Sequence, residues 1–392
     1  MRWMMIAAGG LIAAPGQAAS GPAPVATYWM DVATQSGFGA GITAGGRPSM
    51  DQIMGMMSGG GASVARTLKL RLGSKQKPTA SPAAEHLPPP TLAMGPSLPL
   101  VTPSAAAPVR STPGMPHNFE RPKGRMLIYW GCGEHAGVGQ PTIIDFAKLG
   151  AGKMPPGMAA MANLVRTATG PHSGSAGYGE WPNPRDNRAV PASGSLLGGH
   201  KVQGNYSPPI SFALAAGQDF MPALGLAETG ALPSGAARLG WRPAPTATGY
   251  ALSMFGASDN GDVLMWTSSK SAAMSPLMDY LPPAEVKRLI GTGAVLPPST
   301  AQCMLPAEVA AASPAGMVTL IGFGPEANFS DNPKSPKWTA KVRFKTNASL
   351  MRGMGAMDNA EAAPAQSQPP RKRKRFGLGD VLQGVLPAPI PQ

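Results

Sequence analysis

The chain has 392 residues, of which 50 are glycine and 45 are proline. Helices tolerate neither residue well, so this composition argues against a helical bundle or a coiled coil. Hydrophobic residues make up 43% of the chain, which is enough to bury a core and argues against a wholly disordered protein. The 33 basic and 20 acidic residues leave a net charge of +13, which favours anionic partners.

The N-terminus has the pattern of an export signal. Arg2 precedes an apolar stretch over 3–14, Pro15 ends it, and Gly16 and Ala18 are the small residues that a signal peptidase reads. The stretch is shorter than the roughly 20 residues that a membrane-spanning helix needs. We therefore predict a signal peptide over 1–19 and a periplasmic or extracellular, bacterial location for the mature protein.

Export determines how the two cysteines are interpreted. Cys132 and Cys303 form an even pair in a chain that we expect to leave the reducing cytosol, so we predict a disulfide between them. One alternative is a pair of buried free thiols. Another is an unrecognised hydrolase with Cys132 as its nucleophile, which a disulfide would leave without a thiolate.

The first half of the mature chain is predicted to contain a Gly- and Met-rich segment over 20–62, with a first strand at 26–32, and then a first β domain over 63–204. Leucines alternate with polar residues over 67–72, which is typical of a strand with one buried face. Residues 74–122 are rich in Pro, Ala and Ser, and we expect an extended excursion there rather than a packed element.

Two apolar runs follow that excursion. The run at 126–130 is bounded by glycines and is predicted to be a buried strand, with 142–146 as its partner. Residues 150–199 are predicted to be mostly loop.

The second β domain is predicted over 205–348. The clearest local prediction is a hairpin over 249–268, because Asn260-Gly261 favours the positive φ angles of a tight turn between two apolar strands. A short helix is predicted at 282–290, with proline and glutamate in its first turn and basic residues in its last. Further strands are predicted at 210–215, 239–242, 318–323 and 338–344. In the last of these, Trp338, Ala340, Val342 and Phe344 share one face, and Lys341, Arg343 and Lys345 are expected to face water.

Residues 238–250 resemble part of a fibronectin type III domain. That family often carries a tryptophan, then a proline-containing turn, then a tyrosine that opens the next strand, and here Trp241 and Tyr250 take those places. The resemblance covers about 110 residues and implies an antiparallel sandwich of about seven strands. The fold class we predict is mainly β, with one or two antiparallel immunoglobulin-like sandwiches, long Pro/Gly-rich loops and a disordered C-terminal tail. The expected core aromatics are Trp130, Trp241, Tyr250, Trp266 and Trp338.

Catalytic signatures are lacking in the sequence. It contains neither a Gly-x-Ser-x-Gly elbow nor a His-Glu-x-x-His pair. The five histidines are interpreted as surface or loop residues; they are His86, His117, His135, His172 and His200. We predict no catalytic residue, no metal site and no cofactor, and we lean towards a protein that is not an enzyme.

A run of five cations lies in the predicted tail over 349–392: Arg371, Lys372, Arg373, Lys374 and Arg375. Near an anionic membrane each could contribute roughly 1 kcal/mol, and the apolar residues after them could insert shallowly. A solvated tail without a partner is the alternative, and a protein partner is a further option. Specific nucleic-acid recognition is not expected, because no reader motif accompanies the charges.

Methionine is abundant, at 24 residues. Met351, Met354 and Met357 recur at every third position, and Met54, Met56 and Met57 form a second cluster. Soft thioethers select Cu(I), although methionine also fills irregular cores. The sequence therefore favours an exported envelope protein that binds an anionic membrane or polyanion, with periplasmic Cu(I) handling as the alternative.

Overall fold

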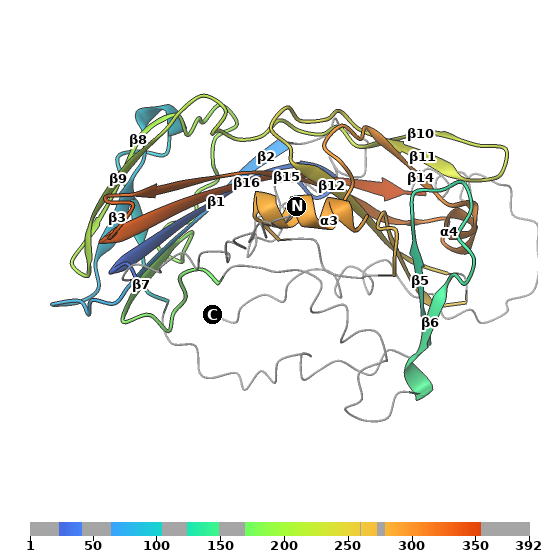
Figure 1. Cartoon of the computed structure of the whole chain (residues 1–392), viewed down its shortest axis with the longest axis horizontal. Coiled ribbons are helices and arrows are strands. Elements are labelled where there is room, and N and C mark those ends of the chain that lie inside the picture. Colours follow the sequence, from blue (N-terminus) through green and yellow to red (C-terminus); the bar gives the residue numbers. More distant parts are fainter. Residues whose placement is uncertain are drawn as a thin grey trace, which may run out of the picture.

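The computed structural model describes residues 23–40, 64–103, 124–148, 169–258, 260–272 and 279–353. Over these residues the chain is mainly β and forms several sheets, which confirms the fold class predicted from the sequence. A long central sheet carries two smaller sheets, and the helices are short (Figure 1).

The central sheet has nine strands in the order β6-β5-β13-β12-β15-β16-β1-β2-β7. Neighbours in it are antiparallel, except that β1 pairs with β16, and β5 with β13, in parallel. The strands are β1 (Ala26–Gly37), β2 (Val64–Ser74), β5 (Arg125–Trp130), β6 (Thr142–Asp145), β7 (Gly177–Trp181), β12 (Gly249–Ala257), β13 (Val263–Thr267), β15 (Gly316–Ser330) and β16 (Trp338–Arg352).

The smaller sheets have four and three strands, in the orders β4-β3-β8-β9 and β10-β11-β14. Their strands are β3 (Ala84–Leu87), β4 (Leu98–Leu100), β8 (Gly198–Gly204), β9 (Ser207–Leu214), β10 (Ala227–Ala231), β11 (Ala237–Gly240) and β14 (Gln302–Leu305). The helices are α3 (Pro283–Gly291), α4 (Ala307–Ala312) and the 3-10 turns η1 (Pro90–Leu92) and η2 (Phe146–Lys148).

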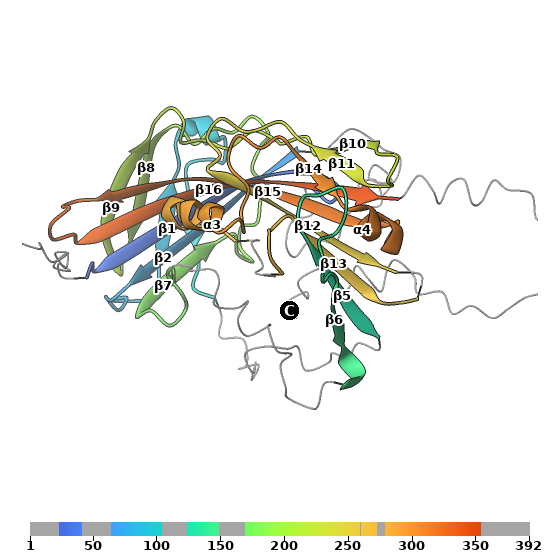
Figure 2. The same cartoon turned by 45° about the vertical axis from the view of Figure 1, so that its right-hand side comes forward.

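The central sheet buries side chains on both of its faces. In β15, Val318 and Leu320 enter the large core shared with the smaller sheets. Ile321 and Phe323 enter a second, smaller core that includes Val286 and Leu289 of α3. Because successive side chains of a strand point to opposite faces, the smaller sheets and α3 cover opposite sides of the central sheet (Figure 2).

Several local predictions are confirmed. The hairpin is β12–β13, and Gly261 in its turn has φ +80°, a value that glycine adopts without strain. The predicted helix is α3, and its glutamate and arginine lie in its first and last turns. Trp241 and Tyr250 lie in the core with ring centroids 5.5 Å apart, as the fibronectin resemblance implies.

The expectation of an unpacked excursion over 74–122 is wrong for its described part. Residues 84–100 form β3, η1 and β4, and Leu92 and Leu98 are completely buried. Pro99 fits this arrangement because β4 is an edge strand of its sheet, where a residue without a backbone N–H is tolerated. The proline-rich composition therefore favours an edge strand here as well as an exposed linker.

Two further differences concern β16. The strand continues to Arg352, so residues 349–352 belong to the sheet and not to a tail. The expectation that Arg343 faces water is also wrong, because its side chain is buried beside Asp31.

The central sheet takes strands from both predicted β domains: β2, β5, β6 and β7 come from 63–204, and β12, β13, β15 and β16 come from 205–348.

Candidate functional site

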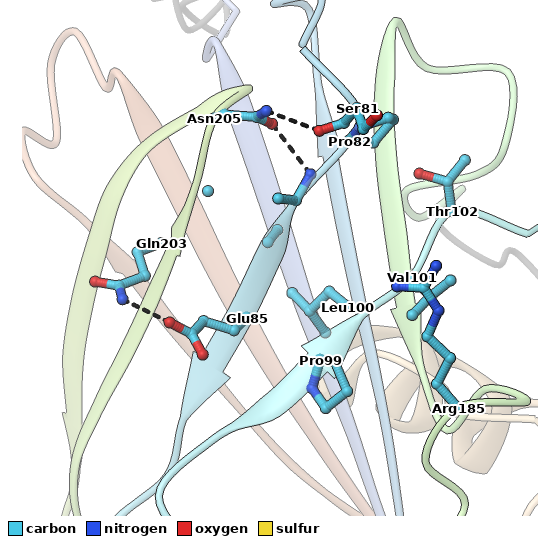
Figure 3. A pocket seen from close by; sticks show the side chains of 13 residues that line it. Ser81, Pro82, Glu85, Pro99, Leu100, Val101, Thr102, Arg185, Gln203 and Asn205 are labelled. Carbon is cyan, nitrogen blue, oxygen red and sulfur yellow. Dashed lines mark hydrogen bonds between the residues drawn. The ribbon is translucent and has the colours of Figure 1, made fainter. Parts of the chain in front are cut away.

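An open pocket lies where β4 passes from the four-stranded sheet to the edge of the central sheet. Val101, just after β4, forms two backbone hydrogen bonds with Glu180 of β7, and these join the two sheets. The pocket beside this junction is open to solvent and has a volume of about 700 Å³ (Figure 3). Its lining includes Glu85, Pro99, Leu100, Arg185 and Gln203.

One side of the pocket is a row of side chains across three strands. Glu85 of β3 stands between its register partners Pro99 of β4 and Gln203 of β8. The Gln203 amide Nε2 donates to Glu85 Oε1 at 2.7 Å (Figure 3). The alternation that points His86 into the core therefore points the Glu85 carboxylate into the pocket.

The upper rim in Figure 3 is held by Asn205. Its side-chain Nδ2 donates to the Ser81 carbonyl oxygen at 2.9 Å, and its Oδ1 accepts from the Ala83 backbone N–H at 3.2 Å. The Asn205 backbone N–H also donates to the Ala83 carbonyl oxygen. These three bonds fix residues 81–83 against the end of β8.

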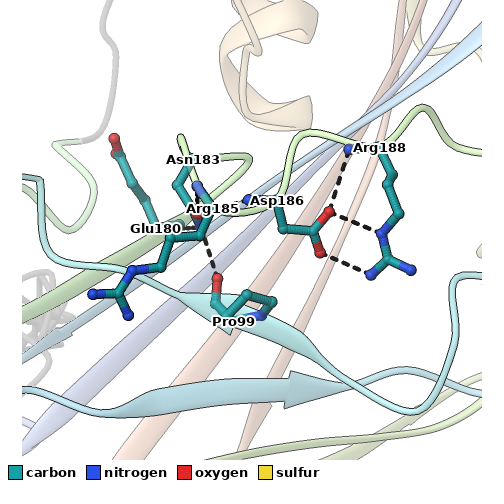
Figure 4. A network of polar contacts seen from close by, with 6 residues as sticks. All are labelled: Pro99, Glu180, Asn183, Arg185, Asp186 and Arg188. Atoms are coloured by element: carbon teal, nitrogen blue, oxygen red, sulfur yellow. Dashed lines mark hydrogen bonds and ion pairs between the residues drawn. The ribbon is translucent and has the colours of Figure 1, made fainter.

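The other side of the pocket is a tight turn after β7, centred on Asn183 (Figure 4). Asn183 Nδ2 donates to the carbonyl oxygens of Pro99 and Glu180, at 2.7 and 2.8 Å. Asn183 Oδ1 accepts from the backbone N–H groups of Arg185 and Asp186. This buried amide thus uses both its donor and its acceptor groups, which gives the turn a defined position beside β4.

The turn carries two arginines in different settings. Arg188 donates to both carboxylate oxygens of Asp186 at 2.9 and 2.8 Å, and this hydrogen bonding lowers the pKa of Asp186 below its usual value. The exposed Arg185 lines the pocket, and we find no hydrogen bond or ion pair of its guanidinium within the described ranges. Arg185 therefore offers donors to a ligand.

The chemistry of this pocket suits binding. It presents the Glu85 carboxylate and the Arg185 guanidinium beside the apolar side chains of Pro99 and Val101. Sites that bind small molecules or chain segments commonly combine an apolar surface with a few placed polar groups.

The structure contains the predicted disulfide between Cys132 and Cys303. Cys303 lies in β14 of the three-stranded sheet, and Cys132 lies just after β5 of the central sheet. The loop around Cys132 is also tied to α4: the Ala307 N–H donates to the Glu134 carbonyl oxygen, and the Ala136 N–H donates to Glu308 Oε2. The disulfide therefore joins two sheets, and hydrogen bonds tie the same loop to the helix that follows β14.

The structure buries four of the five expected core aromatics, namely Trp241, Tyr250, Trp266 and Trp338. Trp130, at the end of β5, is half-buried. Tyr250 Oη accepts from the Ala244 backbone N–H at 2.7 Å, and Trp266 Nε1 donates to the Gly131 carbonyl oxygen at 2.9 Å. These polar atoms are therefore satisfied within the core.

Other predicted features lie outside the described residues. They are the signal peptide, the five cations at 371–375, His117 and both methionine clusters apart from Met351, which is half-buried in β16. In the part of the chain that the structure describes, no helix has the length and apolar character needed to cross a membrane.

The interpretation of all histidines as surface or loop residues is wrong for two of them. His86 and His200 are completely buried, in β3 and β8. The alternation of His200 with Val202, both buried between exposed residues, is a signal that could have indicated this. His135 and His172 are exposed, as expected.

Sequence reasoning also missed the pocket. The segment Trp181-Pro182-Asn183-Pro184-Arg185-Asp186 holds the asparagine-centred turn, and asparagine beside proline is a known signal for one. The position of this turn beside β4 depends on contacts across more than 80 residues. The sequence matches no protein-family model and no curated protein.

Proposed function

We propose that the chain is an exported, non-enzymatic protein of the cell envelope that binds an anionic membrane surface or polyanion. The observation that carries the proposal is the Cys132–Cys303 disulfide. Disulfides persist in the periplasm and outside the cell, whereas cytosolic thiols are kept reduced. The bond supports export, as does the signal-like pattern over 1–19.

The placement of the disulfide supports a structural role. Its cysteines are 171 positions apart, and Cys303 is buried. A cross-link over so many residues restricts the unfolded chain strongly, with roughly 5 kcal/mol as an upper estimate from chain entropy. A stabilising cross-link of this kind suits a binding protein that works without cytosolic chaperones.

The anionic partner is supported by charge. The run at 371–375 supplies five of the 13 net positive charges. The exposed guanidinium of Arg185 provides a second cationic contact, in the pocket. Phosphate oxygens of lipid or of another envelope polymer are suitable acceptors for both.

The location is tested by fractionating cells that express the full chain and alkylating them before lysis. We expect a shortened product outside the cytoplasm, with both cysteines unreactive until reductant is added. An uncleaved cytoplasmic product with two free thiols would refute export.

Binding is tested by sedimenting the mature protein with vesicles of phosphatidylglycerol or phosphatidylcholine, and by competition with soluble polyphosphate. We expect binding to the anionic vesicles only, with a loss when 371–375 are changed to glutamine and when salt is raised. Changing Arg185 to glutamine separates the contribution of the pocket from that of the tail. Salt-independent binding that survives both changes would refute the proposal.

A further inference from the structure

A chain of three buried rings joins the four-stranded sheet to the central sheet. Tyr28 of β1, His86 of β3 and His200 of β8 are each 0% exposed. Tyr28 Oη lies 2.9 Å from His86 Nδ1, and His86 Nε2 lies 3.2 Å from His200 Nδ1. His200 Nε2 ends the chain at 2.7 Å from the carbonyl oxygen of Leu196.

The carbonyl group fixes the direction of these hydrogen bonds. Because a carbonyl oxygen only accepts, His200 Nε2 carries a hydrogen and donates it to Leu196. His200 Nδ1 then accepts from His86 Nε2, and His86 Nδ1 accepts from the Tyr28 hydroxyl. This assignment, with both imidazoles neutral, satisfies all four ring nitrogens and the phenol.

The rings packed on this chain are uncharged. Phe212 of β9 stacks on His200 with centroids 5.1 Å apart, and Phe329 of β15 stacks on Phe212 at 5.0 Å. The rings of Tyr28 and Phe212 also lie near each other, with centroids 6.2 Å apart. A positive charge on either imidazole would therefore enter an aromatic interior between the two sheets.

Charged residues on the packed strands point away from the histidines. Glu85 of β3 lies in the pocket, and Lys201 of β8 is exposed. Asp31 of β1 lies on the opposite face of its strand from Tyr28, where it pairs with Arg71 and Arg343. Burial and then the neighbouring His200 hold the pKa of His86 well below its usual value, and burial lowers the pKa of His200.

We propose that the Tyr28–His86–His200 chain is a pH-sensitive latch, in which protonation of the two histidines releases the four-stranded sheet from the central sheet.

The direction and size of the response follow from proton linkage. In the closed form both imidazoles stay neutral below pH 6.5, where an exposed histidine is already charged. Opening brings both rings into water, and each then takes up a proton. With two protons gained on opening, the equilibrium constant for opening rises by up to about 100-fold for each pH unit below about 6.5. Above about pH 7.5 the latch contributes no pH dependence.

The first experiment localises the opening in the full mature chain by amide hydrogen exchange at pH 7.5, 6.0 and 5.0, corrected for intrinsic exchange rates. We expect β3, β8 and β9 to lose protection in acid while β12 and β15 keep theirs. Equal loss in both sheets, or full protection of β3, β8 and β9 at pH 5.0, would overturn the proposal.

The second experiment measures the titration of each histidine in the unaltered protein, by hydrogen exchange at the imidazole Cε1. His172 is exposed and serves as an internal comparison, whereas His135 is exposed but lies 3.1 Å from the Glu308 carboxylate. We expect His86 and His200 to remain neutral at a pH at which an unburied imidazole is already charged. Titration of all four histidines together would contradict the latch.

Variants then connect the protons to the opening. His86→Gln and His200→Gln each keep hydrogen-bonding groups but remove one titrating site, so the pH response should fall to about tenfold per unit. His172→Gln is the matched control and should keep the response of the unaltered protein. An unchanged response in both buried variants would refute the latch, and if neither variant folds, the two experiments on the unaltered protein decide the question.

Discussion

Asp31 and Arg343 are register partners in the parallel pairing of β1 with β16, and Arg343 Nε donates to Asp31 Oδ1 at 2.7 Å. Both side chains are buried, with 6% and 7% exposure. Arg71 of β2 donates to the other carboxylate oxygen at 2.6 Å. A single carboxylate therefore bridges three neighbouring strands of the central sheet, and the ring of Trp29 lies 4.4 Å from the guanidinium of Arg343.

The first prediction concerns this bridge. Asp31→Asn should lower the free energy of unfolding by about 3–5 kcal/mol, because it leaves the buried guanidinium of Arg343 and the half-buried one of Arg71 without this countercharge. Urea denaturation measures the loss. Lys148→Ala is the control, since Lys148 pairs with Asp145 while its side chain is 85% exposed, and a change within about 0.5 kcal/mol is expected there. If Asp31→Asn lowered the free energy of unfolding no more than Lys148→Ala does, the prediction would be contradicted.

The second prediction uses two glycines of different strands. A Cβ at Gly179 of β7 would lie 2.5 Å from Tyr206 Oη and 2.8 Å from the Leu100 carbonyl oxygen. Gly179→Ala should therefore destabilise the protein by about 1–3 kcal/mol. Gly199→Ala in β8 meets nothing within 4 Å and should be neutral or slightly stabilising. Thermal unfolding compares the two, and a tolerated Gly179→Ala would contradict this packing of Tyr206 on β7.

The third prediction concerns the disulfide. The double variant Cys132→Ser, Cys303→Ser should have a free energy of unfolding about 2–5 kcal/mol lower than that of the unaltered protein. Reductant should lower the stability of the unaltered protein towards that of the variant and leave the variant unchanged. Cys132 and Cys303 are the only cysteines of the chain. If reductant lowered the stability of both proteins equally, the loss would not come from this disulfide, and the prediction would be contradicted.

The fourth prediction concerns Tyr206, whose side chain packs on β7, at alkaline pH. Burial raises the pKa of Tyr206 to about 12. The unfolded chain loses this proton near pH 10, so the contribution of Tyr206 to stability is complete below pH 10 and falls by about 1.4 kcal/mol per unit as the pH rises to 12. Tyr206→Phe should remove this part of the alkaline loss, measured by denaturation between pH 8 and 12.

At neutral pH the hydroxyl groups of Tyr206 and Tyr178 should contribute differently to stability. Tyr206 Oη is buried without a hydrogen-bond partner among the described residues, so Tyr206→Phe should not destabilise the protein at pH 7. Tyr178 Oη donates to Glu180 Oε2 at 2.7 Å, and Tyr178→Phe should lower stability by about 1–2 kcal/mol. A larger loss of stability in Tyr206→Phe than in Tyr178→Phe would indicate an unrecognised hydrogen bond at the Tyr206 hydroxyl.

Local signals in the sequence predicted local structure well. Asn260-Gly261 identified the β12–β13 hairpin, and the charge pattern at 282–290 identified α3. The mainly-β class followed from composition and alternation. The two cysteines could be paired because there were only two of them, and the export predicted from the sequence favours their oxidation.

Features that depend on distant segments could not be predicted in this way. Arg343 alternates with apolar residues as an exposed cation would, and its burial depends on Asp31, which lies 312 positions away. Similarly, His86 follows a stretch rich in proline and alanine, and its burial depends on Tyr28 and His200. The pocket joins a turn after β7 to β3, β4 and β8, and no periodicity within one segment indicates that association.

The parallel pairing of β1 with β16 has a consequence for biogenesis. Synthesis from the N-terminus produces β1 long before β16, and until then one edge of β1 has no neighbour. Pairings between such distant segments form slowly, and unpaired strand edges promote aggregation in the meantime. We therefore expect the newly made chain to depend on a holding chaperone until β16 has emerged.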